Sequence, residues 1–406
     1  MNPYVVIGAG QAGMQVCDSL RKSGYDGELI LLGEEDSLPY QRPPLSKKFL
    51  TGDLDRDRLL FRPAAYFDKI AVDVRLRTQV ESIDRAARQI VLGDGSTLAY
   101  TKLALTTGTR VRPLNCPGHE LDNIYYVRTL TDSEMLLQRL ASTERVAVIG
   151  GGFIGLEVAA VARELEKQAT VIEAQERLMA RAVSPVVSDF YAKLHRSRGV
   201  DVRCSSAVES IVESKQGLLV NLADGARIES DIVVAGIGVL PNSELAENCG
   251  LACNSGIVVD EYAQTSDPHI VAAGDCTMHF NGFLQREIRL ESVQNAVDQA
   301  KVAAATLCGQ PQAYRQVPWF WSDQYDVKLQ MAGIGMPFDQ YAVRGDLASQ
   351  AFSVFYFRDN TFVGADSINR PAEHMACRKL LTQGTTLSVA QAQDIDFDLK
   401  QLAKAG

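Results

Sequence analysis

The 406-residue chain has no long hydrophobic run and no excess of positive charge. No stretch reaches the roughly 18 uninterrupted apolar residues that a membrane-spanning helix needs, so none is expected. The 41 Lys and Arg residues are outnumbered by 50 Asp and Glu, which gives a net charge of −9. Because phosphate backbones and anionic lipids attract basic surfaces, neither nucleic acid nor a membrane is expected as the main partner. The content of 46% hydrophobic and 22% charged residues excludes disorder and coiled coil.

Cysteine is sparse: the chain has eight, scattered along its length, and no CxxC pair. A disulfide framework is typical of small secreted chains that are dense in cysteine, so these thiols are expected to be reduced. Cys249 and Cys253 lie four residues apart and are interpreted as structural. Since an apolar strand pattern begins at Tyr4, the N-terminus leaves no room for a signal peptide, and a cytoplasmic location is expected.

Two further kinds of site are missing from the sequence. The five histidines have no metal-ligand spacing with one another or with cysteine, so no metal site is expected. No nucleophile-elbow, P-loop or kinase signature occurs either. The sequence therefore offers no pattern for metal-dependent, nucleophile-elbow, P-loop or kinase chemistry, and any reaction must rest on other features.

Glycine-rich loops occur twice between a strand and a helix. The first, Gly8–Gly13, reads Gly-Ala-Gly-Gln-Ala-Gly, and the second, Gly150–Gly155, reads Gly-Gly-Gly-Phe-Ile-Gly. The first lies between a predicted strand and helix, Tyr4–Ile7 and Met14–Ser23. The second lies between Arg145–Ile149 and Leu156–Lys167 in the same way. The sequence therefore predicts an internal duplication of one dinucleotide-binding unit.

Each unit continues into a second strand that ends at an acid. The strand Glu28–Leu32 is followed by Glu34, with Glu35 as a competing candidate, and Ala169–Ile172 is followed by Glu173. Glycines let the backbone approach a pyrophosphate at the positive end of the helix, and such an acid binds the adenosine ribose hydroxyls. Two dinucleotides in one chain fit a hydride relay between a flavin and a nicotinamide.

The rest of the chain contains further predicted strands, a long predicted helix and a C-terminal segment with a different residue pattern. A helix is predicted over Ser292–Cys308, and from Val317 the strands become aromatic and alternating, which indicates a third domain. The C-terminal segment Arg370–Gln383 is predicted as a helix. The other predicted strands are Val74–Asp84, Ile90–Leu92, Lys102–Thr106, Val202–Val212, Leu218–Leu222, Asp231–Gly236, Val327–Ala332, Phe352–Phe357 and Thr361–Ala365.

Six short segments give the chain a resemblance to a known family. They are Pro39–Lys47, Thr107–Gly108, Gly150–Glu157, Ala273–Cys276, Glu291–Ala296 and Pro318–Tyr325. With these, the chain resembles the FAD-dependent NADH:ferredoxin reductases of bacterial oxygenase systems, the group of putidaredoxin reductase and biphenyl dioxygenase reductase. One departure is Thr106, where the family often has alanine; the added hydroxyl is not expected to abolish binding.

The resemblance implies an α/β, glutathione-reductase-like fold with two Rossmann-type dinucleotide-binding domains and a C-terminal α+β domain. The FAD domain is then discontinuous, over residues 1–112 and 240–316. The NAD domain covers residues 113–239, and the C-terminal interface domain covers residues 317–406.

The resemblance also implies the residues of the site. Expected FAD contacts are Gly8, Gly10, Ala12, Gly13, Glu34, Arg42, Lys47, Val80, Thr107, Gly108, Arg128, Asp275 and Val293. Expected NAD contacts are Gly150, Gly152, Phe153, Ile154, Gly155, Glu173 and Gly238. Lys47, Glu157 and Trp321 are the expected catalytic residues, with Lys47 paired to Glu157 near the flavin and Trp321 close to its ring. Glu173 is expected to favour NADH over NADPH, with Arg177 softening the repulsion of a phosphate.

The activity that follows is transfer of hydride from NADH to FAD and of single electrons to a ferredoxin that feeds an oxygenase. A monomer or weak dimer is expected. Two alternatives stay open. One is an NADH oxidase or disulfide reductase of the same superfamily, which needs a redox cysteine beside the flavin. The other is a redox sensor that resembles apoptosis-inducing factor, in which turnover is secondary.

Overall fold

The computed structural model describes residues 2–334 and 337–405, and its contacts divide the chain into two compact units. Unit 1 contains Met1–Gln41, Leu59–Arg110 and Leu240–Pro318. Unit 2 contains Arg42–Arg58, Val111–Val239 and Trp319–Gly406. None of the described helices is both long enough and apolar enough to cross a membrane.

Unit 1 is built on a five-stranded parallel sheet of order β19-β7-β1-β2-β3, with β1 at its centre. Its strands run as β1 (Tyr4–Ile7), β2 (Leu29–Leu32), β3 (Val72–Arg75), β7 (Lys102–Leu105) and β19 (Ile270–Ala272). The central strands are apolar throughout because both faces of the sheet are covered. Thus Val6 and Leu31 pack in one core cluster, and Val5 and Ile30 pack in another on the opposite face.

Two helices form the first of these clusters with the sheet. They are α1 (Gln11–Lys22), which follows the first glycine loop, and α8 (Val293–Leu307). The buried positions of α8 are mostly alanines, which let the helix axes approach closely. The opposite face carries a three-stranded antiparallel sheet of β4 (Val80–Asp84), β5 (Gln89–Leu92) and β6 (Thr97–Ala99).

The remaining elements of unit 1 are short. They are α3 (Ala64–Lys69), α7 (Glu244–Asn248), β18 (Ile257–Val259), β20 (Thr277–Asn281) and β21 (Arg286–Ile288). Where the chain changes unit, it forms α2 (Arg56–Leu59) and a two-stranded sheet of β8 (Thr109–Val111) and β17 (Val239–Pro241).

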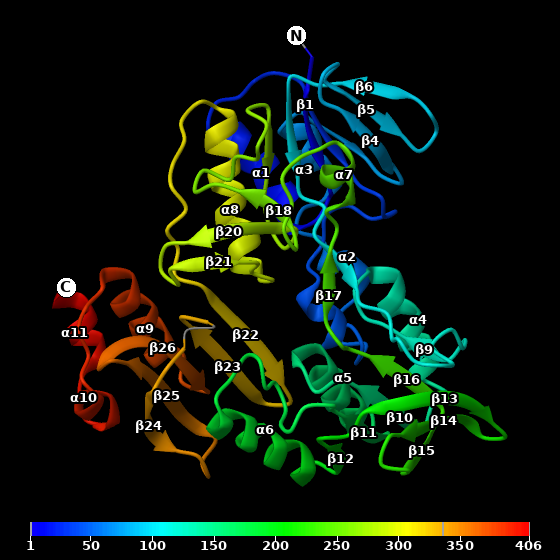
Figure 1. Ribbon diagram of the computed structural model, residues 1–406, viewed down its shortest axis with the longest axis vertical. Helices are drawn as coiled ribbons and strands as arrows, with labels where there is room; N and C mark the ends of the chain where they lie inside the picture. Colours follow the sequence, from blue (N-terminus) through cyan, green and yellow to red (C-terminus); the bar gives the residue numbers. More distant parts are fainter. Residues whose placement is uncertain (1, 335–336, 406) are drawn as a thin grey trace. The chain divides into compact units, whose positions relative to one another are not determined.

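Unit 2 contains a second five-stranded parallel sheet, of order β12-β11-β10-β16-β9 (Figure 1). Its strands are β9 (Ile124–Tyr125), β10 (Arg145–Ile149), β11 (Gln168–Ile172), β12 (Val200–Arg203) and β16 (Ile232–Ala235). A three-stranded antiparallel sheet follows, with β13 (Val208–Ser214), β14 (Gly217–Leu222) and β15 (Arg227–Ser230). The helices are η1 (Pro43–Ser46), α4 (Leu130–Leu140), α5 (Phe153–Glu164) and α6 (Pro185–Ser197).

The two parallel sheets share one topology, which confirms the predicted duplication. The four strands β3-β2-β1-β7 correspond in order to β12-β11-β10-β16. Only the fifth strand has a different origin, because β19 comes late in the chain and β9 comes before its own glycine loop. In both halves an Asp-Gly turn closes the antiparallel sheet: Asp94 and Asp224 each accept a 2.9 Å bond from the backbone nitrogen two residues on.

Residues 319–405 add a five-stranded antiparallel sheet, of order β22-β23-β26-β25-β24, to unit 2 (Figure 1). The strands are β22 (Trp319–Gln324), β23 (Val327–Ala332), β24 (Gln340–Asp346), β25 (Ala351–Arg358) and β26 (Thr361–Ile368). The helices are α9 (Pro371–Gln383), α10 (Val389–Gln393) and α11 (Leu399–Ala405).

The sequence located most elements, and the differences have local causes. The glycines at positions 10 and 152 cap their helices, so each helix starts three residues before its predicted first residue, at Gln11 and Phe153. The run Val74–Asp84 is two strands rather than one, since Arg77 adopts a left-handed conformation with φ 50°. Ser205, with φ 52°, divides Val202–Val212 in the same way.

Candidate functional site

The first glycine loop leaves no room for side chains at its two ends. Gly8 has φ +110°, and a Cβ there would overlap the carbonyl group of Thr106. A Cβ on Gly13 would overlap the carbonyl group of Gly8. The hydroxyl of Thr106 lies 2.9 Å from the carbonyl oxygen of Gly8, so the threonine ties the loop to β7. This departure from the family's usual alanine thus adds a contact rather than a clash.

The second loop repeats this geometry in unit 2. Gly150 has φ +106°, and a Cβ there would come within 2.5 Å of the carbonyl oxygen of Gly236. A Cβ on Gly155 would overlap the carbonyl group of Gly150. The two loops therefore have the same close approaches at the same positions, and only glycine meets both demands.

Both loops end in a helix N-terminus that fits a pyrophosphate. Gly10 and Gly152 are the N-caps of α1 and α5, neither helix has a side-chain cap, and neither has an acid in its first turn. A Cβ on Gly10 would meet nothing within 4 Å, and one on Gly152 only a carbonyl oxygen at 3.9 Å. Side chains are thus kept away from the positive end of each helix, where an anion binds best. The residues present fit a dinucleotide at each loop.

The acid of the second unit lies against its own loop. Glu173 is half-buried, and its Oε2 accepts a hydrogen bond from the backbone N–H of Gly151 at 2.6 Å. Its Oε1 accepts from the N–H of Gln175 at 2.7 Å. Arg177, which was expected to soften the repulsion of a phosphate, donates to the carbonyl oxygens of Ala180 and Val183, at 2.7 and 2.8 Å. That side chain holds the loop after β11.

In the first unit the structure distinguishes the two candidate acids. Tyr40 donates a hydrogen bond to the carboxylate of Glu35 at 2.6 Å, whereas the side chain of Glu34 is exposed. This favours Glu34 as the acid that a ribose would meet. Val80, expected beside the adenine, begins β4 and is buried in the core cluster under the sheet.

The loops after β7 and β19 meet the first glycine loop. Gly274 has φ +90°, and a Cβ there would lie 3.1 Å from the Cβ of Ala12, so the turn that carries Asp275 packs directly on α1. The Thr107 hydroxyl donates to the carbonyl oxygen of Asn242 at 2.6 Å, and the Asn242 amide donates to the carbonyl oxygen of Thr107 at 2.9 Å. Sequence reasoning missed Asn242, because 135 residues separate the partners.

Other expected FAD contacts begin or precede helices. Val293 is the first residue of α8, where the hydroxyl of Ser292 caps the helix by accepting from the Asn295 N–H at 3.0 Å. In unit 2, Arg42 donates to the carbonyl oxygen of Arg128 at 2.7 Å, so these two residues lie together. Arg128 is held by its neighbours, because its N–H donates to Asp132 in the capping box of α4.

Lys47 and Glu157 form a largely buried ion pair. The Nζ of Lys47 lies 2.7 Å from the Oε2 of Glu157, with side-chain exposures of 18% and 4%. Lys47 follows the 3₁₀ helix Pro43–Ser46 and also donates to the carbonyl oxygen of Pro43 at 3.1 Å. Glu157 lies one turn beyond Phe153 on α5. The structure thus brings together two residues that only the resemblance had linked; their place beside a flavin remains a prediction.

Two serines that the sequence did not point to complete this pair. The hydroxyl of Ser46 donates to the Oε2 of Glu157 at 2.5 Å, and that of Ser322 donates to its Oε1 at 2.6 Å. Both serines are buried. A buried carboxylate needs such donors, since an anion removed from water is otherwise costly.

The aromatic residues of β22 are only partly buried. Trp319 and Trp321 lie side by side, with ring centroids 5.6 Å apart, and the guanidinium of Arg378 lies 4.3 Å from the ring centre of Trp319. Phe320, between the two tryptophans, packs against Phe153 with the ring centroids 4.7 Å apart. Of the other expected NAD contacts, Ile154 is 39% exposed in the first turn of α5, and Gly238 has φ +109°.

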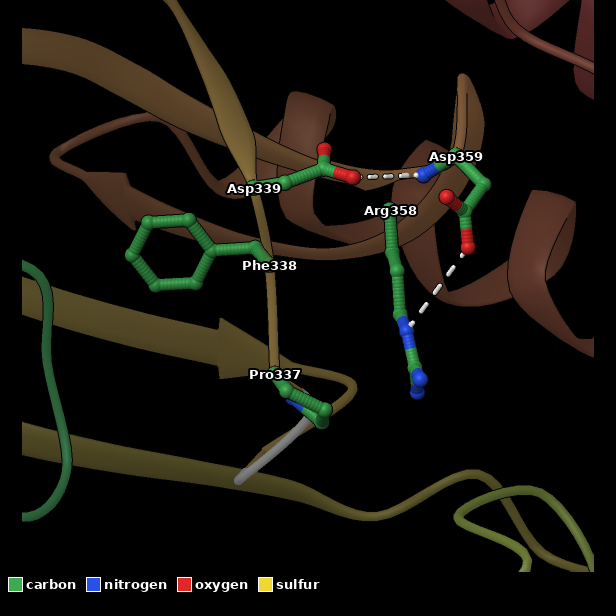
Figure 2. Close-up of a pocket in the computed structure, with 5 residues that line it drawn as sticks. All are labelled: Pro337, Phe338, Asp339, Arg358 and Asp359. Atoms are coloured by element: carbon green, nitrogen blue, oxygen red, sulfur yellow. Dashed lines mark hydrogen bonds and ion pairs between the residues drawn. The ribbon is translucent and has the colours of Figure 1, made fainter.

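A separate hollow lies between the segment Pro337–Asp339 and the turn at Arg358 (Figure 2). There the N–H of Asp359 donates to Asp339 at 2.9 Å, and the Arg358 guanidinium lies 3.9 Å from the Asp359 carboxylate. These polar groups face one another within the turn (Figure 2). None of the five residues that line this hollow is among the predicted site residues.

Family models match most of the chain. Residues 2–300 match the family "Pyridine nucleotide-disulphide oxidoreductase", and residues 319–403 match the family "Reductase C-terminal". Rhodocoxin reductase of Rhodococcus erythropolis is 46% identical over 397 residues, which cover 98% of this chain and 93% of that protein.

Solved structures agree over the whole length. The ferredoxin reductase for the CYP199A2 system of Rhodopseudomonas palustris superposes with a TM-score of 0.97 at 41% identity, covering 99% of this chain and 100% of that one. The reductase in the covalent putidaredoxin reductase–putidaredoxin complex superposes with a TM-score of 0.96 at 39% identity, covering 100% of this chain and 98% of that one.

Proposed function

Because the chain belongs to the pyridine nucleotide-disulphide oxidoreductase family, among the FAD-dependent ferredoxin reductases, we propose that it oxidises NADH and reduces a ferredoxin that serves an oxygenase. The observation that carries the proposal is the pairing of two equivalent glycine loops in one chain with a C-terminal reductase domain. The loops fit two dinucleotides, and relatives that match over nearly the whole chain are reductases of small electron carriers by name.

We assign the cofactors by loop. In this proposal the N-terminus of α1 binds the pyrophosphate of FAD through Gly8, Gly10 and Gly13, and Glu34 holds the ribose. The N-terminus of α5 binds NADH through Gly150, Gly152 and Gly155, and Glu173 orients its adenosine ribose. FAD, when bound, accepts hydride and releases the two electrons one at a time.

We assign the remaining residues to positioning the cofactors and to tuning the charge around them. The ammonium of Lys47 holds its protons at Nζ next to Glu157, which keeps a positive charge in a largely dry environment without leaving it unpaired. Asp275 and Arg128 are assigned to the flavin side, and Trp321 to the ring itself. Domain limits of 1–112 with 240–316, 113–239 and 317–406 are part of the same proposal.

The partner is a ferredoxin, and the protein works as a monomer or weak dimer in the cytoplasm, without nucleic acid or membrane. All eight cysteines are free thiols, and Cys17, Cys276 and Cys377 are buried. Burial raises the pKa of Cys17 to about 12, which makes it a poor nucleophile. No observation favours a disulfide relay, so electrons leave without a protein thiol.

The test is NADH-dependent reduction of a purified ferredoxin, followed in a stopped-flow spectrometer. Ferredoxin should accelerate NADH oxidation, and alkylation of the partly exposed cysteines should leave most of this rate. Loss of the rate on alkylation would instead support the disulfide reductase. Slow NADH oxidation that no ferredoxin accelerates would support the redox sensor.

A further inference from the structure

The strand β22 presents two different faces. Side chains alternate along a strand, so Trp319 and Trp321 share one face, and Phe320, Ser322 and Gln324 share the other. The tryptophans are partly exposed, whereas Ser322 and Gln324 are 0% and 1% exposed. Two fully buried polar side chains in one strand require partners, because an unpaired polar group in the interior is costly.

The partner of Ser322 lies on α5, in register with the strand. Phe320 packs on Phe153 at 4.7 Å, and the Ser322 hydroxyl donates to the Glu157 Oε1 at 2.6 Å. Phe153 and Glu157 are one helical turn apart, and Phe320 and Ser322 are two strand residues apart. The same strand face thus contacts both the first turn of α5, at the glycine loop, and the ion pair one turn further on.

Behind Ser322 the polar contacts continue to α6. The amide nitrogen of Gln324 donates to the Ser322 hydroxyl at 3.2 Å, and the Nε2 of His195 lies 2.8 Å from the amide oxygen of Gln324. Since that oxygen can only accept, His195 must carry its proton on Nε2. The Tyr325 hydroxyl then donates to the Nδ1 of His195 at 3.3 Å.

Every donor in this chain of contacts is directed toward Glu157. His195 is fully buried, and burial lowers its pKa, so the ring stays neutral. A glutamine amide does not give up a proton near neutral pH, and therefore the chain cannot conduct protons. What it can do is orient: it fixes the Ser322 hydroxyl so that its hydrogen is directed at the carboxylate.

The carboxylate of Glu157 divides its partners between its two oxygens. Oε2 accepts from Lys47 at 2.7 Å and from Ser46 at 2.5 Å, and Oε1 accepts from Ser322. Without Ser322, Oε1 would have to rotate toward another donor, and the rotation would displace Oε2 from Lys47. The orientation of the ion pair therefore depends on β22.

We propose that Ser322 and Gln324 are positioning residues that hold Glu157, and through it the Lys47 ammonium, in the geometry used for hydride transfer. The inference rests on the proposed function in one respect, namely that Lys47 and Glu157 lie beside the reacting cofactors. The partners lie on three elements, β22, α5 and α6, and they account for the burial of these two polar side chains.

The first test is flavin reduction by NADH alone in the holoenzyme, followed by stopped flow. Ser322→Ala should lower the rate constant at saturating NADH about tenfold, the size expected when a charged group loses one hydrogen bond, with the dissociation constant of NADH changed less than about twofold. Ser322→Thr keeps the hydroxyl and should recover most of the rate.

The matched control is Ser230→Ala. Ser230 is 1% exposed in β15, and its hydroxyl has no hydrogen-bond partner among the described residues, so its removal should leave the rate unchanged. If Ser322→Ala reduces the flavin at the native rate, or if Ser230→Ala is as slow as Ser322→Ala, the inference is wrong. Should Ser322→Ala fail to fold, Ser322→Cys, a weaker donor of similar size, is compared with Ser322→Thr in the same way.

The second test needs no turnover. In a crystal structure of Ser322→Ala, the Glu157 carboxylate should be rotated and the Lys47 Nζ displaced from it. In nitrogen-15 NMR of histidine-labelled protein without NADH, His195 should carry its proton on Nε2, and Gln324→Leu should change this signal while Ser230→Ala should not. An undisturbed ion pair in Ser322→Ala, or a His195 protonated on Nδ1, would contradict the inference.

The two proposals can fail separately. If the protein reduces flavin with NADH but no ferredoxin accepts the electrons, the proposed function fails and the Ser322 comparison still decides this inference. If ferredoxin is reduced while Ser322→Ala keeps the full rate and an undisturbed ion pair, the function stands and the inference is lost.

Discussion

The carboxylate of Glu173 accepts a hydrogen bond from the backbone N–H of Gly151 at 2.6 Å, so the acid at the end of β11 is fixed against the glycine loop. A carboxylate held there accepts hydrogen bonds from a ribose hydroxyl and repels a 2′-phosphate. Arg177 donates to the carbonyl oxygens of Ala180 and Val183. These neutral acceptors leave its positive charge in place, so we expect it to offset part of the repulsion and the exclusion of NADPH to be incomplete.

NADH should therefore exceed NADPH in kcat/KM by at least about 1–3 kcal/mol, roughly 5- to 150-fold. Glu173→Gln should reduce this ratio, because the neutral amide no longer repels phosphate. Steady-state kinetics with both cofactors measure it, and the exposed Glu176→Gln is the control. Equal efficiency of the two cofactors in the native protein would overturn the assignment.

The ion pair predicts a change in flavin potential. If Lys47 lies beside the flavin, its charge stabilises the extra negative charge of the reduced cofactor, so Lys47→Met should lower the reduction potential. A redox titration against a reference dye measures it. The neighbouring Lys48 is exposed, and Lys48→Met should leave the potential nearly unchanged. Identical potentials for the two variants would place Lys47 away from the ring.

Ferredoxin docking should depend on salt. Many ferredoxins are acidic and this chain carries a net charge of −9, so a local basic surface must overcome the repulsion. Candidates are Arg58, Arg62, Arg315, Lys328, Arg370, Arg378 and Lys379. Each exposed charge pair contributes only about 0.2–1 kcal/mol, so the effect is collective and acts on the association rate.

Raising the ionic strength should slow ferredoxin-dependent turnover and leave flavin reduction by NADH nearly unchanged, because screening acts on the encounter. Charge reversal at Arg58, Lys328 and Lys379, which are exposed, should have the same selective effect. Turnover that is indifferent to salt would indicate an apolar docking surface instead.

What the sequence could predict depended on distance along the chain. Within each unit, the glycine loop, the strands on either side of it and the acid lie within about 30 residues, and local periodicity was enough to locate them. The contacts around the ion pair, in contrast, join residues that are far apart along the chain. Ser322 and Glu157 are 165 residues apart, and Gln324 and His195 are 129 apart.

No periodic pattern relates residues at such separations, and a serine or glutamine in a strand looks ordinary until its burial is known. The pairing of Lys47 with Glu157 came from family resemblance and not from spacing.

A buried acid in the C-terminal sheet predicts a dependence of stability on pH. Asp366 in β26 is 3% exposed and accepts a hydrogen bond from the Tyr356 hydroxyl at 2.6 Å. Burial raises the pKa of Asp366 to about 7. Because the folded carboxyl holds its proton more tightly than the unfolded one, its contribution is greatest below about pH 4 and is lost as the pH rises to 7.

The difference between pH 4 and pH 7 amounts to about 3 kcal/mol if Asp366 acts alone. Asp366→Asn keeps an acceptor for Tyr356 and cannot ionise, so the slope of stability against pH should flatten between about pH 4 and 7. Urea unfolding at several pH values measures this slope. An exposed acid, Asp359→Asn, serves as the control, and equal slopes in the native protein and Asp366→Asn would contradict the prediction.

The chain's last segment depends on one arginine. Arg344 in β24 is 5% exposed, and its guanidinium lies 3.1 Å from Glu373 of α9. It also donates to the carbonyl oxygens of Asp394, Ile395 and Phe397, which lie between α10 and α11. One side chain therefore joins the sheet, α9 and the C-terminal residues.

Arg344→Met should destabilise the protein by about 3–5 kcal/mol, since it removes the nearer cation of the half-buried Glu373 and leaves three carbonyl oxygens without this donor. The control is Arg358→Met: that guanidinium is 55% exposed and 3.9 Å from Asp359, so its loss should change the free energy of unfolding by less than about 1 kcal/mol. Urea unfolding measures both. Limited proteolysis should cut the Arg344 variant first between residues 394 and 398. If both variants unfold at the same urea concentration as the native protein, Arg344 does not hold the C-terminal residues.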